Sequence, residues 1–260
     1  MNRKLSSSAH QFAFFYQTLP ARYLKNDSFT ITDVELIGRM THIVRLGIGD
    51  TALLFNGIHC YELCIETVDR KAMRVRVVNV FAQKTVQPSV GILLPVLKKS
   101  ALEEAIYGCV ESGISNIQLV MTQKSNHSYH HAKEKERLQR IVIAACEQAK
   151  QFTIPEIRTP LPLPQALLLH KVTPVQTLLF ADPEGTPFFE VLTSLHANKQ
   201  KNKTKHIDFL VGPEGSLTPE ETRLVYEYGA LGVRLTPTIL RAQQAAVVLA
   251  GALVSSVYQD

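Results

Sequence analysis

The chain has no run of apolar residues long enough to cross a membrane. Its longest such stretch, Ala245–Val254, has only about half of the roughly 20 residues that a spanning helix needs. The N-terminal residues MNRKLSSSAHQ also lack the apolar segment of a secretory signal peptide. We therefore expect a soluble protein of the cytoplasm.

Cysteine is scarce, and its spacing is uninformative about metals. The 260 residues include four cysteines: Cys60, Cys64, Cys109 and Cys146. Cys60 and Cys64 are too far apart for a CxxC redox pair, and a zinc site would need two further ligands at short spacing. We expect buried or half-buried reduced thiols rather than a disulfide or a metal site.

Two common nucleotide-binding motifs, GxGxxG and GxxxxGK[ST], are missing, which argues against a dinucleotide site or a P-loop. The chain is basic, with a net charge of +5 and a pI near 9.0. This charge allows an RNA partner, because neutralising phosphates supplies much of the affinity for nucleic acid, but many basic proteins bind none. The apolar fraction of 45% is ordinary for a globular protein and is enough for one large core or two smaller ones.

Residues 28–82 show short β-rich segments separated by turns. The pattern predicts strands over 51–55, 60–67 and 73–80, with Asn56-Gly57 as a hairpin turn. We interpret this region as a small, mostly antiparallel β domain, expected to be a barrel.

After residues 83–88, strand and helix patterns alternate. Short apolar strands are expected over 91–96, 117–121, 177–181, 207–211 and 231–235, and the clearest helix over 133–150. This alternation predicts a mainly parallel sheet with helices on both faces.

Three segments are expected to form loops. Thr153–Pro164 carries four prolines, and Asn198–Lys205 is a basic polar run. The NHSYHH segment contains His127, His130 and His131 but no carboxylate at helical spacing. We interpret the histidine segment as a polar loop, while contact of either polar segment with RNA stays open.

The most informative segment is IDFLVGPEGSL, residues 207–217. A hydrophobic strand ends in a turn with two glycines, and Thr218-Pro219-Glu220-Glu221 then has the pattern of a capping box at the start of a helix. In open α/β sheets, ligands bind at the carboxyl ends of the strands, and glycines let backbone amides approach a ligand closely. The motif alone is equally compatible with a tight strand-to-helix turn.

A second segment, LTPTILRAQQAA, spans residues 235–246. A strand end is followed by a proline-containing loop, by Arg241, and by an Ala-rich helix expected over Ala242–Val257. Arg241 is either a functional residue or an arginine of the surface or of an ion pair.

Together these segments resemble the RsmE family. GPEGSLTPEE followed by LTPTILRAQQA is similar to the family's GPEGGLSxxE and LGPRILRTETA. The helix RLQRIVIAACEQ resembles a family helix that is followed by a PEI strand, and HIVRL, GD and LFNG in the N-terminal half also resemble the family pattern. The matches occur in the family's order over nearly the whole chain.

The resemblance implies a fold and an activity. Residues 1–84 would form a PUA-like RNA-binding β-barrel, and residues 85–260 a SPOUT methyltransferase domain, an α/β domain whose parallel sheet is flanked by helices and ends in a trefoil knot. The family acts as a homodimer and transfers a methyl group from S-adenosylmethionine (SAM) to N3 of a uridine in 16S ribosomal RNA of the small subunit.

The resemblance also assigns roles to individual residues. Arg241 would contact the target uridine or its phosphate and is the candidate catalytic residue, because its guanidinium stays charged and donates bidentately. The residues expected to bind SAM are Phe180, Ala181, Leu210, Gly212, Pro213, Glu214, Gly215, Leu235, Ile239 and Leu240. The residues expected to bind RNA are Arg45, Lys98, Lys99 and Lys124.

The chain departs from the family pattern near Arg241. Thr236 replaces a glycine, Thr238 an arginine and Gln243 a glutamate, and Ser216 replaces a glycine in the first motif. These changes keep two alternatives open: a catalytically weakened RNA-binding homodimer, and a SPOUT methyltransferase that acts on another RNA.

Overall fold

The computed structural model describes residues 11–20, 22–82, 87–125, 131–172, 176–199 and 205–258. The chain divides into two compact units, each of which is described by itself. The first comprises residues 1–84 and 146–154, and the second comprises residues 85–145 and 155–260. Over the described residues, no helix is both long and apolar enough to span a bilayer.

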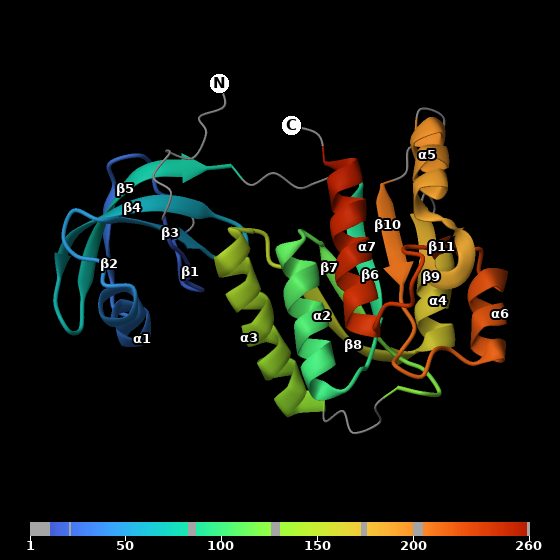
Figure 1. The fold of residues 1–260 in the computed structure, drawn as a ribbon. Coiled ribbons are helices and arrows are strands. Elements are labelled where there is room, and N and C mark those ends of the chain that lie inside the picture. Colours follow the sequence, from blue (N-terminus) through green and yellow to red (C-terminus); the bar gives the residue numbers. More distant parts are fainter. Residues whose placement is uncertain are drawn as a thin grey trace. The chain divides into compact units, whose positions relative to one another are not determined.

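The first unit is built on a five-stranded sheet in the order β1-β3-β4-β5-β2 (Figure 1). Its elements are β1 (Ala13–Phe15), β2 (Ser28–Ile31), α1 (Val34–Gly38), the π-helix η1 (Arg39–Ile43), β3 (Thr51–Phe55), β4 (Cys60–Val68) and β5 (Met73–Phe81). All strand pairs are antiparallel except β1 with β3. The three strands and the hairpin predicted here are confirmed, and Gly57 at the hairpin turn has a φ of +93°, which a glycine adopts without strain.

The second unit is an α/β layer structure. Its strands are β6 (Ser89–Pro95), β7 (Asn116–Met121), β8 (Glu156–Pro162), β9 (Gln176–Pro187), β10 (His206–Leu210) and β11 (Leu231–Arg234). They form one sheet in the order β11-β9-β10-β6-β7-β8, and every neighbouring pair is parallel. The predicted parallel sheet is therefore confirmed.

Helices cover both faces of this sheet (Figure 1). They are α2 (Lys99–Glu111), α3 (His131–Ala149), α4 (Leu163–Val172), α5 (Phe188–Lys199), α6 (Pro219–Glu227) and α7 (Ala242–Val257). One core lies between the sheet and the α4–α6 side and includes Leu93, Leu167, Leu210 and Val225. Neighbouring strand residues alternate between the faces, so Ile92 and Leu94 point to the other face, where α7 packs against β6 and α2.

The prediction of a loose segment over Thr153–Pro164 was wrong. Residues 156–162 form β8, which pairs in parallel with β7. The sheet tolerates Pro160 and Pro162 because β8 is its edge strand, the position in a sheet where proline is found. Most of the histidine segment (residues 126–130) and of the basic run (residues 200–204) lies outside the described residues.

Polar side chains form a compact network at the amino-terminal edge of the sheet. The imidazole of His206 lies 2.5 Å (Nδ1) from the Ser89 hydroxyl and 2.7 Å (Nε2) from the Asp208 carboxylate, and Asn116 Nδ2 is 3.3 Å from the same Nε2. Gly91 makes room for it, because a Cβ there would lie 2.4 Å from Asp208 Oδ1 and 2.5 Å from Asn116 Oδ1. Ser89, Asn116, His206 and Asp208 help to line a cavity of about 300 Å³.

The cysteines are free thiols. Three are buried (Cys60, Cys109 and Cys146), and Cys64 is half-buried, as predicted. Burial raises the pKa of Cys60 and of Cys146 to about 12, and it also raises the pKa of Cys109.

Candidate ligand site at the carboxyl edge of the sheet

The site lies where β9, β10 and β11 end. Because these strands are parallel, the loops that follow them converge on one edge of the sheet. They surround a cavity of about 390 Å³, within the usual range for small-molecule sites. Its walls come from the end of β6 and start of α2 (Lys98, Ser100, Ala101), the β9 strand (Phe180–Pro183), the β10–α6 turn (Val211–Glu214, Ser216, Leu217), α6 (Thr222), and the loop and first turn of α7 (Ile239–Gln243, Ala245).

The β10–α6 turn contains the Gly-Pro-Glu-Gly motif. Gly212 lines the cavity, and a Cβ at this position would meet no other protein atom closer than 3.6 Å. The absence of a side chain at Gly212 is therefore not required for packing and leaves space on the cavity side. Ser216 also lines the cavity and has a φ of +58°, a left-handed conformation that favours glycine.

Hydrogen bonds hold the turn in place. Glu214 Oε1 accepts from the Lys98 backbone N–H at 3.0 Å, which ties the turn to the start of α2. Lys124 Nζ donates to the Gly215 carbonyl at 2.7 Å. A Cβ on Gly215 would lie 3.0 Å from Lys124 Cδ, so this glycine makes room for the lysine chain.

The helix that follows begins as the sequence predicts. Thr218 and Glu221 form a capping box, and Pro219 is the first helical residue. Glu221 is buried, and its second carboxylate oxygen accepts from the Gln123 backbone N–H at 2.8 Å. The helix cap thus also fixes the loop after β7, where Lys124 lies.

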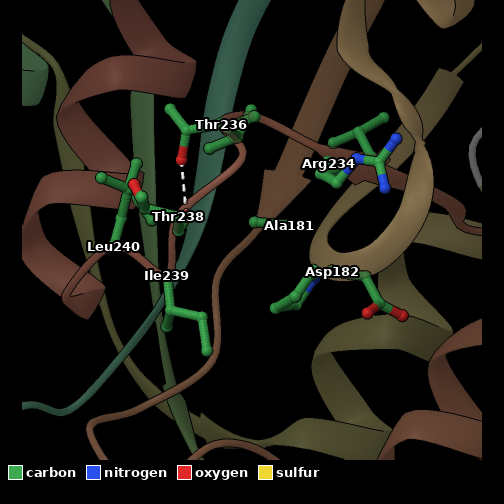
Figure 2. A pocket seen from close by; sticks show the side chains of 11 residues that line it. Ala181, Asp182, Arg234, Thr236, Thr238, Ile239 and Leu240 are labelled. Atoms are coloured by element: carbon green, nitrogen blue, oxygen red, sulfur yellow. Dashed lines mark hydrogen bonds between the residues drawn. The ribbon is translucent and has the colours of Figure 1, made fainter.

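The loop over residues 235–241 forms the opposite wall. Figure 2 shows Thr236, Thr238, Ile239 and Leu240 on this loop, facing Ala181 and Asp182 across a smaller recess of about 70 Å³. The Thr236 hydroxyl donates to the Thr238 carbonyl at 2.6 Å, which holds the loop in a tight curve. Ile239 is 85% exposed and lines the cavity, so it offers apolar surface to a ligand.

A bulge in β9 forms the third wall. Pairing of β9 with β11 runs from Phe180 opposite Gly232 directly to Thr186 opposite Val233, which leaves residues 181–185 outside the ladder. Bulges commonly redirect the chain beside functional sites. Here Ala181, Asp182 and Pro183 of the bulge line the cavity.

The structure brings together most of the residues expected to bind a cofactor. Those that line the cavity are Phe180, Ala181, Gly212, Pro213, Glu214, Ile239 and Leu240, with Arg241 and Lys98 beside them. Leu235 lines the adjoining recess, and Leu210 is fully buried beneath the turn. Gly215, Lys99 and Lys124 are not in the cavity wall, and Arg45 is an exposed residue of the first unit with a φ of +64°.

Sequence reasoning missed several wall residues. Asp182 and Pro183 lie beyond the expected end of their strand, and only the unusual DPEG sequence that follows the strand signals a turn there. Gln243 and Ala245, which lie on α7, were interpreted as helix positions and not as cavity residues. Gln243 Nε2 donates to Glu104 Oε2 of α2 at 3.4 Å.

The charged side chains of the wall differ in whether they already have partners within the protein. The Glu214 and Asp182 carboxylates accept hydrogen bonds from the protein. Arg241 precedes α7 as its N-cap residue and is exposed, and among the described residues it has no ion-pair partner. The cavity therefore offers apolar and backbone walls for a small organic ligand, and the exposed cations Lys98 and Arg241 lie in the same wall.

A parallel α/β sheet with a cavity at its carboxyl edge defines the class of α/β proteins in which small organic ligands bind at that edge. A family model for an RNA methyltransferase domain matches residues 85–254. The chain belongs to this family of RNA methyltransferases.

Similar proteins extend the likeness over the whole chain. The Ribosomal RNA small subunit methyltransferase E of Mycobacterium bovis is 24% identical over 246 residues, which are 92% of this chain and 90% of the relative. The crystal structure of the protein of the same name from Neisseria gonorrhoeae, bound to SAM, has a TM-score of 0.79 at 21% identity and covers 95% of this chain and 98% of its own. A Legionella pneumophila protein, whose structure was determined in complex with SAM, has a TM-score of 0.77 at 22% identity, with the same coverage.

Proposed function

We propose that this protein transfers the methyl group of SAM to N3 of a specific uridine in the 16S RNA of the small ribosomal subunit. One observation carries the proposal: in a chain of the RNA methyltransferase family, the GPEG turn, the β9 bulge and the ILR loop enclose one cavity of about 390 Å³. The ribosomal RNA methyltransferases to which the chain is similar support the choice of substrate.

The wall residues fit an adenosyl ligand. Gly212 and Pro213 bring backbone to the cavity without long side chains, and Leu240 and Ile239 offer apolar surface for the adenine, with Leu235 in the adjoining recess. Phe180 and Ala181 would close the side opposite the loop, and Glu214 would hold the turn in shape. Leu210 and Gly215 would support the wall from outside it.

When bound, SAM supplies an electrophilic methyl group on its sulfonium. N3 of uridine carries a proton and becomes a good nucleophile only when that proton leaves. The protein must therefore hold the base against the methyl donor and favour the deprotonated imide, and positioning supplies much of the rate. The guanidinium of Arg241, which lines the cavity, would stabilise negative charge on the uracil carbonyls.

RNA would extend beyond the cavity over basic residues. Lys98 lies in the wall, and Lys99 and Lys124 lie on neighbouring segments of the same edge. In the first unit, residues 1–84 would act as a PUA-like RNA-binding barrel, with Arg45 as an exposed contact. Phosphate contacts of this kind would provide affinity, while the cavity selects the base.

The finer architecture is also a proposal. Residues 85–260 would form a SPOUT domain with a trefoil knot, which the family resemblance and the insertion of β9 between β11 and β10 support. The protein would act as a cytoplasmic homodimer. Support comes from α7, an almost entirely apolar helix whose Val248 is 41% exposed.

Mass mapping of 16S RNA from cells that lack the gene tests the function. We expect one uridine to lose a methyl group, wild-type protein to restore it, and Arg241→Ala to fail. Arg158→Ala is the matched control, because Arg158 is a half-exposed arginine near the amino edge, paired with Glu156 at 3.0 Å. Unchanged 16S RNA with a methyl group missing from another RNA would support the alternative substrate.

A second candidate is an RNA-binding homodimer with little turnover. It is favoured by Thr238 and Gln243, which replace an arginine and a glutamate of the family pattern beside Arg241. Calorimetric titration with SAM separates the two: an enzyme binds SAM, and absence of binding at millimolar SAM would exclude the methyltransferase.

A further inference from the structure

The bulge of β9 depends on a contact from α6. Tyr226 lies in the last turn of α6 (Pro219–Glu227), and its hydroxyl donates to Asp182 Oδ2 at 2.5 Å. The ring of Tyr226 also meets the Phe180 ring edge-on, with centroids 5.9 Å apart. One side chain therefore touches both the last paired residue of the strand and the second residue of the bulge.

Asp182 connects Tyr226 to the backbone of the bulge. Its other oxygen, Oδ1, accepts from the Glu184 backbone N–H at 2.9 Å. Both carboxylate oxygens are thus engaged within the protein, so that Asp182 acts as a link between α6 and the bulge backbone. The neighbours of Asp182 on either side, Ala181 and Pro183, both line the cavity.

Two glycines allow this arrangement. A Cβ on Gly232 would lie 2.2 Å from the Tyr226 hydroxyl oxygen, so only glycine lets the phenol pass over β11 to reach Asp182. A Cβ on Gly185 would lie 2.6 Å from the backbone of Gly232, so glycine also closes the base of the bulge. The base and the tip of the bulge are therefore both constrained.

We propose that Tyr226 is a positioning residue for the cofactor: by holding Asp182, it holds the wall formed by Ala181–Pro183 in the shape that accepts the adenosyl group. The inference rests on the proposed function, since it takes the ligand of this cavity to be SAM. Burial and the Asp182 carboxylate raise the pKa of Tyr226, so the phenol keeps the proton that it donates throughout the neutral range.

Calorimetric titration of SAM into the wild type and Tyr226→Phe tests the inference. The variant keeps the ring and loses one hydrogen bond to a charged group, and such a loss weakens SAM binding about 10-fold. At saturating SAM, methyl transfer should change less than twofold, because Tyr226 does not touch the reacting atoms. Tyr258→Phe, which alters a tyrosine that is 58% exposed at the end of α7, should bind as the wild type does.

Two further variants test whether Tyr226 acts on the cavity wall through Asp182. Gly232→Ala should displace the phenol and weaken SAM binding to a similar degree. Asp182→Ala should do the same, and adding Tyr226→Phe to it should cause no further loss, because both changes remove the same link. Urea unfolding of each variant separates a local change from loss of the fold.

The outcomes are distinct. If the wild type binds SAM and Tyr226→Phe binds it within twofold, or if the effects of Tyr226→Phe and Asp182→Ala multiply, the positioning role is excluded and the proposed function stands. If the wild type does not bind SAM, the proposed function and the inference both fail.

Discussion

The two edges of the six-stranded sheet carry polar residues in opposite ways. At the amino-terminal edge, Ser89, Asn116 and Asp208 all bond to the imidazole of His206. At the carboxyl edge, the carboxylates of Glu214 and Asp182 bond within the protein, whereas Arg241 has no ion-pair partner in the described part of the chain. Both edges line cavities of several hundred cubic ångströms.

We interpret the network at the amino-terminal edge as stabilising and the carboxyl edge as the proposed ligand site. Buried polar groups that satisfy one another contribute a well-defined fold and leave little capacity for a ligand. A wall formed partly by backbone and small residues, such as Gly212 and Ala181, leaves that capacity free. We therefore interpret the carboxyl edge, where the two sequence motifs expected to bind SAM line one cavity, as the functional edge.

The largest effect is expected from filling the carboxyl-edge cavity. A Cβ on Gly212 meets protein atoms only at 3.6 Å or beyond, so Gly212→Val should keep the fold while its methyl groups occupy ligand space. We expect SAM affinity to fall by about 100-fold or more, equivalent to ~2.7 kcal/mol, in calorimetric titration. Gly212→Ala should give a smaller loss. Undiminished affinity in Gly212→Val would show that the ligand lies elsewhere.

The corresponding substitution at the amino-terminal edge adds a methyl group at Gly91. Gly91→Ala brings a Cβ within 2.5 Å of two side chains of the His206 network, and both must move. We expect a loss of roughly 2–3 kcal/mol in the free energy of unfolding, measured by urea denaturation. Folded Gly91→Ala protein should bind SAM within twofold of the wild type. A selective loss of SAM binding without loss of stability would contradict the assignment of the two edges.

The smallest effect concerns backbone strain in the GPEG turn. Ser216 has a φ of +58°, where the RsmE pattern has glycine. Ser216→Gly should relieve this strain and stabilise the protein by up to about 1 kcal/mol, measured as a shift of the urea midpoint. Ser115→Gly, in a loop without positive φ, is the control and should not stabilise. Destabilisation by Ser216→Gly would mean that the hydroxyl makes a compensating contact.

Periodicity and local motifs predict those elements whose position depends on neighbouring residues in the sequence. The GPEG turn, the capping box of Thr218 and Glu221, and α7 lie where the sequence indicates. Periodicity did not predict β8, although the family resemblance gives a strand at PEI. Its prolines would exclude it from the middle of a sheet, and nothing local reveals that it is the edge strand.

The candidate site was predictable where its motifs are continuous in the chain. Gly212–Glu214 and Ile239–Arg241 are two such motifs, and both line the cavity. Asp182 was not predictable, because its place depends on a bulge whose anchor, Tyr226, lies 44 residues further along the chain. No periodicity encodes a contact between a helix end and a bulge at that separation.

The buried thiols provide a kinetic reporter without any engineering. Only thiolates react with alkylating reagents, and the burial and raised pKa of Cys60 and Cys109 protect both in the folded state. Cys60 lies on β4 of the first unit and Cys109 on α2 of the second. The rate at which each becomes alkylated therefore measures how often its own unit opens, so mass spectrometry of one sample can follow the two units separately.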